Sequence, residues 1–471
     1  MLLRRGSFEQ SALEDLQDVL AGLQPSGRRL VVHFHGGLVD RKHGMAIAER
    51  LTPIYEQAGG YPLFVLWRSG FAETVTSSLR SVAQENIFRR LLARVIQFTL
   101  SKARRERDGD RAIDLVVPRL DVVYKEAFGG FEGEPYAQLD GEFSELGETQ
   151  EHQIERTLRR DHVIQDETDR IVRALTSDDG DRAAGTAGIA VTLMSPEVLQ
   201  EMIGDGPREG DRSVFASARV AKGALMTVKR VLSRLRSGRG HGVYCTAIEE
   251  LLREFYVANV GGSLWRQMKR DTELSFGSDA HRFGGTALLA ELAAIDPATT
   301  PLLVGHSTGA LYICNLLARA DIALPSERTF DVAMLAPACD FDAMDRTLVR
   351  HGRRVGRLRI FSMSDEHERE DRLVPGVYPR SLLYFVSGVL ENEADWPLLG
   401  MQRFHTVDPP FSGEAFPAIG RVRDQLAARA NSSVWSIATG GPGLCSKAVR
   451  HGDFDDDPVT LESVAQLVGG N

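Results

Sequence analysis

The chain has 471 residues, with 56 basic and 65 acidic side chains and a formal net charge of −9. With this balance we do not expect the basic surface that binding to nucleic acid requires, and the length predicts two domains or one large domain with an insertion. Apolar residues make up 43% of the chain and charged residues 26%, as is typical of soluble globular proteins.

The N-terminal segment MLLRRGSFEQ has two arginines but no apolar run behind them, so we expect no signal peptide. No stretch approaches the roughly 18 uncharged apolar residues that a membrane span needs. The cysteines are widely scattered and form no CxxC pair, which suits a reducing compartment. They are Cys245, Cys314, Cys339 and Cys445. We therefore expect a soluble, cytoplasmic protein.

The first 70 residues predict the start of a parallel sheet. Residues 8–22 have the pattern of an amphipathic helix. The β-branched run at 30–34 and the segment PLFVLW at 62–67 predict buried strands. Between them, residues 44–60 predict a helix that ends at two glycines. A strand–helix–strand unit of this kind favours parallel pairing of its strands.

Residues 71–281 predict a long, mainly helical insertion, because the alternation of strands and helices stops there. A helix over 84–104 has an apolar stripe beside several arginines, and the segment 216–236 is basic and helical. Loops are predicted where Gly, Asp and Glu are frequent, at 128–150 and 176–188, and SGRGHG at 237–242 predicts a flexible joint.

From residue 282 onward the alternation resumes. Strands are predicted at 301–306, 329–337, 357–363 and 433–438, and helices at 280–295, 309–319, 341–350, 380–391, 413–430 and 458–468. Asp457 can cap the last helix, and Pro458 occupies its first position, where the missing N–H has no cost. The predicted fold is α/β, a mostly parallel sheet flanked by helices, formed by residues 1–70 and 282–471 around the insertion.

The motif GHSTG at 305–309 follows a predicted strand and precedes a predicted helix. Gly-x-Ser-x-Gly in this context is typical of a nucleophile elbow, a tight turn that exposes the serine hydroxyl above the strand ends. Side chains at Gly305 or Gly309 would collide with neighbouring backbone in such a turn. The motif therefore predicts a nucleophilic Ser307, with His306 pointing away from the hydroxyl.

The chain resembles the α/β-hydrolase superfamily, specifically its serine esterase and lipase-like members. Three segments carry the resemblance and follow the order of that family: HFHGGLV at 33–39, GHSTG at 305–309 and VRHGDFDDDPVTLESV at 449–464. The likeness covers roughly residues 1–70 and 282–471. The long insertion falls where many members of the family have a lid.

The resemblance implies an oxyanion hole. A tetrahedral intermediate has its negative charge on one oxygen, and each preorganised N–H donor there lowers the barrier by about 3 kcal/mol. One donor is the N–H of Thr308, at the start of the elbow helix. The second is expected from Gly37, with Leu38 as an alternative.

His451 is the predicted general base, because a catalytic histidine of this fold follows the last strand. His405 is the second candidate for the general base, but the element that follows it is a helix and not the last strand. His33 and His35 share one strand face, yet no third ligand has the spacing of a metal site, so a structural role for His35 is favoured.

The acid that orients His451 is expected in the loop SMSDEHERED at 362–371. Asp365 is the first choice because it comes directly after the strand, and Glu368 and Asp371 are alternatives. The acidic run after His451 lacks the spacing of a calcium-binding loop, and helix capping and solvation account for it better. This run consists of Asp453, Asp455, Asp456 and Asp457.

These features predict a serine hydrolase that cleaves a carboxylic ester through an acyl-enzyme and needs no metal or organic cofactor. The same elbow also serves peptidases and amidases, and a catalytically silent interaction module of this fold is a further alternative. The expected substrate is a small-molecule or lipid ester.

The insertion is expected to decide specificity. Its helix 84–104 could contact a membrane surface or pack within a lid, and packing within a lid is favoured. A protein partner that binds the insertion is a further alternative. Trp265 and Met268, at helical spacing, are expected in the core.

Overall fold

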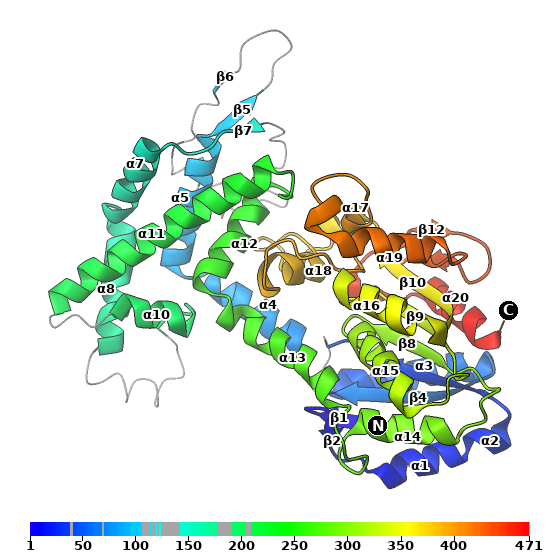
Figure 1. Cartoon of the computed structure of the whole chain (residues 1–471). Coiled ribbons are helices and arrows are strands. Elements are labelled where there is room, and N and C mark those ends of the chain that lie inside the picture. Colours follow the sequence, from blue (N-terminus) through cyan, green and yellow to red (C-terminus); the bar gives the residue numbers. More distant parts are fainter. Residues whose placement is uncertain are drawn as a thin grey trace.

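The computed structural model describes residues 1–37, 41–67, 70–105, 113–114, 119, 122–123, 142–176, 191–203 and 209–470. Its central element is an eight-stranded sheet with the order β11-β10-β9-β8-β3-β4-β1-β2, parallel at every pairing except that of β1 with β2 (Figure 1). The strands are β1 (Leu2–Arg4), β2 (Ser7–Phe8), β3 (Arg29–Phe34), β4 (Gly60–Trp67), β8 (Leu302–His306), β9 (Phe330–Leu335), β10 (Val355–Met363) and β11 (Ser433–Ser436). The predicted α/β class, with a mostly parallel sheet flanked by helices, is confirmed.

Both faces of the sheet are buried, which explains why its central strands are apolar runs and do not alternate with polar residues. In β3, Leu30, Val32 and Phe34 face one layer of helices, whereas Val31 faces the other. The first layer contains α1 (Leu13–Ala21), α14 (Gly284–Ala294), α15 (Gly309–Ala323), α16 (Phe341–His351) and α19 (Pro417–Ala427). The second contains α3 (Arg41–Gln57) and α20 (Pro458–Gly469).

Short elements complete this part of the chain. They are α2 (Leu23–Ser26), α17 (Asp365–Glu370), α18 (Leu382–Phe385), the π-helix η3 (Val386–Leu390), the hairpin β12 (Ala438–Thr439) with β13 (Cys445–Ser446), and the 3-10 turns at Gly352–Arg354, Gln402–Phe404, Gly413–Ala415 and His451–Asp453. Asp457 caps α20 through a hydrogen bond from the Thr460 N–H, at the position that the sequence predicts.

The segment between β4 and β8 is mainly helical, and most of its helices lie beside the sheet as a second body (Figure 1). The helices are α4 (Phe71–Val82), α5 (Asn86–Leu100), α7 (Glu148–Arg159), α8 (His162–Thr176), α10 (Pro196–Ile203), α11 (Glu209–Arg236), α12 (Val243–Phe255), η1 (Ala258–Gly262) and α13 (Ser263–Leu274). A small antiparallel sheet joins β5 (Ala103–Arg105) to β6 (Ile113–Asp114) and β7 (Glu142–Phe143).

The apolar stripe of α5 is buried within this second body, where Ile87, Leu91 and Val95 are almost inaccessible to solvent. On the same helix, Arg90 and Arg94 both contact the buried carboxylate of Asp161, at 2.8 and 2.6 Å. The stripe packs against protein, as the favoured interpretation of this helix requires. Its basic side chains are not simply solvated, however, because two of them neutralise a buried charge.

Some predicted elements differ from those observed. The segment at 8–22 begins as an edge strand, since β2 pairs with β1 before α1 starts. The predicted helix at 380–391 is a single α-turn followed by a π-helix, in which a side chain at Gly388 would collide with the carboxylate of Glu249. The predicted joint at 237–242 is a packed turn, because His241 is buried and its carbonyl accepts a hydrogen bond from Arg380 at 2.7 Å.

Most of the predicted loops at 128–150 and 176–188 lie outside the described residues, although α7 begins within the first of them. Among the helices that the structure describes, none combines the length and the apolar character needed to cross a membrane.

Candidate active site

Ser307 lies in the turn between β8 and α15 with a backbone φ of +52°. For a residue other than glycine, this left-handed conformation costs about 1–2 kcal/mol, so neighbouring contacts must enforce it. The Ser307 N–H donates to the carbonyl of Leu335 at 2.8 Å, and the Ser307 carbonyl accepts from Ala338 at 3.1 Å. These bonds hold the strained turn against the end of β9.

The two glycines of the motif allow the close approach of backbone that this turn needs. A Cβ atom at Gly305 would lie 2.7 Å from the carbonyl carbon of Gly309, and one at Gly309 would collide with the carbonyl oxygen of Phe34. Both contacts are with backbone, which cannot move aside as a flexible side chain can. Position 307 therefore has the geometry that the sequence motif predicts for an elbow.

The loop after β3 lies directly over this serine. A Cβ atom at Gly36 would lie 3.1 Å from the Cβ of Ser307. The Gly37 N–H donates to the hydroxyl of Thr308 at 2.7 Å, so the two predicted oxyanion-hole residues are in contact. In this arrangement the Gly37 N–H is directed at a side-chain oxygen of the protein. Leu38, the alternative donor, lies outside the described residues.

His451 begins the turn before α20 and is 3% exposed. Its ring lies 5.4 Å from the ring of His306, with 28° between the planes. Among the described residues, neither ring nitrogen of His451 has a hydrogen-bond partner, so the expected Ser–His–Asp hydrogen bonds are not formed in this structure. Burial, assisted by His306, lowers the pKa of His451 to about 3, so its imidazole is neutral at physiological pH.

His306 belongs to the same cluster as His451. Its Nδ1 lies 3.4 Å from a carboxylate oxygen of Asp455, and its Nε2 lies 3.0 Å from the carbonyl oxygen of His451. Burial alone would lower the pKa of His306, but the negative charge of Asp455 and the two acceptors outweigh it and raise the pKa. The expectation that helix capping and solvation account for the acidic run is wrong for Asp455, which is buried and contacts His306, although Asp457 does cap α20.

The predicted acids occupy different surroundings. Asp365 accepts a hydrogen bond from Tyr384 at 2.6 Å and pairs with Arg369 at 2.8 Å. Glu368 is buried against Ser381, and burial raises its pKa well above the usual range, which favours the neutral acid. Asp371 accepts a hydrogen bond from the backbone N–H of His451 at 2.9 Å. Of the three, Asp371 is the one for which the structure gives a contact with His451.

The other three histidines considered in the sequence have structural contacts. The His35 ring accepts a hydrogen bond from the Trp67 N–H at 2.8 Å and also bonds to the Gly36 carbonyl, which fixes the glycine loop. His33 contacts the hydroxyl of Tyr55 at 2.8 Å. His405, the runner-up base, lies with its Nε2 2.7 Å from the carbonyl of Leu399.

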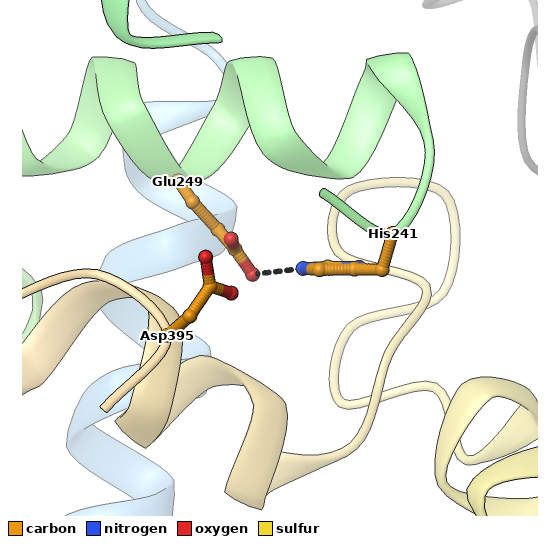
Figure 2. A group of neighbouring side chains, drawn as sticks. All are labelled: His241, Glu249 and Asp395. Atoms are coloured by element: carbon orange, nitrogen blue, oxygen red, sulfur yellow. Dashed lines mark hydrogen bonds and ion pairs between the residues drawn. The ribbon is translucent and has the colours of Figure 1, made fainter. Parts of the chain in front are cut away.

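A second polar cluster lies where the helical body meets the sheet-containing body. Figure 2 shows His241, Glu249 and Asp395 converging, with His241 Nε2 at 2.9 Å from Glu249. Such a group resembles a metal site, but the guanidinium of Arg234 already contacts Glu249 and Asp395, each at 2.7 Å, and Glu250 at 3.1 Å. Because Arg234 supplies the positive charge, we assign the cluster a structural role in joining α11, α12 and the segment after η3.

Comparison of the chain with protein-family models, with curated proteins and with solved structures found no match. Sequence reasoning missed Asp455, since nothing in its acidic run distinguishes it from its neighbours. The expectation that Trp265 and Met268 lie in the core is confirmed, and the Met268 side chain occupies the space that a Cβ at Gly37 would enter, with the sulfur 2.8 Å from that position, a contact that the sequence did not indicate.

Proposed function

We propose that the protein is a serine hydrolase of the α/β-hydrolase type that cleaves a carboxylic ester through an acyl-enzyme on Ser307. One observation carries this proposal: a serine held at a φ of +52° between two sterically required glycines directly follows His306, whose ring lies 5.4 Å from that of His451, a buried histidine whose ring nitrogens have no partner among the described residues. Backbone strain of this kind is found mainly at functional sites, where it is part of the mechanism.

In the proposed reaction, the Ser307 hydroxyl attacks the ester carbonyl as His451 takes its proton. The N–H groups of Thr308 and Gly37 stabilise the oxyanion, which requires the Thr308 hydroxyl to turn away from Gly37 when substrate binds. His451 then gives the proton to the departing alcohol. Water repeats the sequence: it attacks the acyl-enzyme, loses its proton to His451 and releases the acid and free Ser307.

Asp371 is the best-supported acid partner, because its carboxylate already contacts His451. Asp365, the first choice from the sequence, is held by Tyr384 and Arg369. A rotation of the His451 ring that brings Nδ1 to the Asp371 carboxylate and Nε2 toward Ser307 would complete the triad.

The helical insertion of residues 71–281 is proposed as a cap over this site. Its helix α13 places Met268 against Gly37 of the proposed oxyanion loop. Trp265 and Lys269 of the same helix fix α13 in place, through contacts of 2.8 and 2.6 Å with Glu391. A cap in this position would shape the acyl pocket and thus select the substrate.

The direct test is labelling of the whole chain by a fluorophosphonate, in which the serine oxygen displaces fluoride from phosphorus. Ser307→Ala should abolish labelling, whereas Ser362→Ala, the loss of a buried serine on β10, should leave it unchanged. Equal labelling of the Ser307→Ala protein would refute the proposal. A series of p-nitrophenyl esters and peptide amides then separates an esterase from a peptidase, and the absence of turnover on both classes identifies a silent fold.

A further inference from the structure

The main chain of His451 is held on both sides. Its N–H donates to Asp371 at 2.9 Å, and its carbonyl accepts from Nε2 of His306 at 3.0 Å. The imidazole rings of His306 and His451 also lie nearly parallel, 5.4 Å apart. The described residues offer no hydrogen bond to the ring of His451, so the polar contacts that hold this residue are those of its main chain.

His306 is itself fixed by Asp455. The His306 ring lies between two groups that can only accept hydrogen bonds, a carboxylate at 3.4 Å and a backbone carbonyl at 3.0 Å. A hydrogen on each nitrogen satisfies both acceptors, and the negative charge of Asp455 outweighs burial and raises the pKa of His306, which favours the imidazolium. His306 and Asp455 are 4% and 3% exposed, and a buried ion pair has little freedom to change its geometry.

We propose that His306 and Asp455 are a positioning pair that fixes the distance between the imidazole of His451 and the hydroxyl of Ser307. His306 precedes the nucleophile directly in the chain and bonds to the main chain of the base, so it connects the two reacting groups through one residue. A displacement of about 1 Å at a reacting centre can lower the rate about 100-fold. This inference rests on the proposed serine hydrolase function.

Two substitutions at position 306 separate its two contacts. The amide nitrogen of His306→Gln can take the place of Nε2 and retain the bond to the His451 carbonyl. The amide nitrogen of His306→Asn can take the place of Nδ1 and contact Asp455, but it does not reach that carbonyl. We expect His306→Asn to lower kcat for p-nitrophenyl acetate and the rate constant of fluorophosphonate labelling by about 10- to 100-fold, with KM within about twofold.

His306→Gln should retain at least about one fifth of the wild-type kcat, because the bond to His451 persists. Asp455→Asn, which removes the charge that holds His306, should also lower kcat. His405→Gln is the matched control, since the ring of His405, a half-buried histidine, is also bonded to a backbone carbonyl but lies on a different loop. It should leave kcat unchanged.

The outcomes separate this inference from the function on which it rests. If His306→Asn is labelled as fast as the wild type while Ser307→Ala is not labelled, the positioning pair is refuted and the hydrolase stands. Equal losses of kcat in His306→Gln and His306→Asn also refute it, because the bond to the His451 carbonyl that glutamine retains should preserve activity. Labelling of Ser307→Ala refutes the function itself. Rate constants are measured on folded protein, verified by circular dichroism, and Asp455→Asn replaces His306→Asn if the latter does not fold.

Discussion

Asp371 contacts His451 through the backbone of the histidine and not through its ring: Oδ2 accepts the His451 N–H at 2.9 Å. If Asp371 also serves as the triad acid, Asp371→Asn should lower kcat on the order of 10²–10⁴-fold, because the imidazolium that forms in the reaction loses its counter-charge. Asp365→Asn should change kcat by less than about threefold. Steady-state ester hydrolysis measures both, and a larger loss in Asp365→Asn would restore Asp365 as the acid.

The glycines of the elbow should be essential for folding as well as for catalysis. In Gly309→Ala the new methyl group would collide with the backbone of Phe34, so we expect a loss of stability of about 3 kcal/mol or more. Gly420→Ala is the control, because Gly420 lies in α19 with open space around it, and alanine there should stabilise the helix by about 1 kcal/mol. Urea unfolding measures both changes. If Gly309→Ala leaves the free energy of unfolding unchanged, the turn is less tight than described.

Arg234 should be the most sensitive residue of the contact between the two bodies. Its guanidinium neutralises Glu249, Glu250 and Asp395, which are all buried. Arg234→Met removes the positive charge that all three share, although His241 still contacts Glu249 and Arg239 still lies 3.7 Å from Asp395. It should lower the free energy of unfolding by about 3–5 kcal/mol. Arg170→Met removes an ion pair from an arginine that is 53% exposed, and it should change stability by less than about 1 kcal/mol. Equal effects of the two substitutions would contradict the structural role of the cluster.

Removal of metal ions should not destabilise the protein. A divalent cation at His241, Glu249 and Asp395 would compete with the guanidinium of Arg234, which already lies on the carboxylates. Dialysis against a chelator should therefore leave Tm unchanged. A fall of several degrees, reversed by one added metal, would show that the cluster binds an ion.

Stability should fall as the pH is lowered from about 6.5 to about 4. Burial lowers the pKa of His33 and His451 to about 3 and that of His35 and His405 to about 4. In this range the unfolded chain binds protons at these positions and the folded chain does not, so acid favours unfolding. His306 acts in the opposite direction, because its pKa is raised: its contribution is present below about 6.5 and is lost as the pH rises through its folded value.

Thermal unfolding between pH 7.5 and 4.5 checks this prediction. His405→Gln removes one of the histidines with a lowered pKa and should give a shallower dependence of Tm on pH than the wild type. A Tm that rises on acidification would contradict the burial of neutral histidines.

The sequence allowed the central sheet to be predicted because its strands are apolar on both faces and alternate with helices. The edge pair β1 and β2 was missed, since strands of two or three residues give no periodic signal. Their pairing depends on tertiary contacts, including a bridge from Ser7 to Phe283.

Within the candidate site, a local motif allowed the elbow to be predicted, and chain order suggested His451. The contacts of Asp371 and Asp455 were not predictable. Each lies among similar acidic residues, and only the packing of distant segments determines which carboxylate is buried and what it touches.

The placement of β3 between β4 and β8 has a consequence for biosynthesis. β3 and β4 can pair as soon as they are made, but β8, which covers the other edge of β3, follows only after the whole helical segment has been translated. Until then β3 has an apolar edge with unsatisfied backbone groups, which is prone to association with other nascent chains. We therefore expect the yield of native protein to depend on how quickly the helical segment folds on the ribosome and on whether chaperones shield that edge meanwhile.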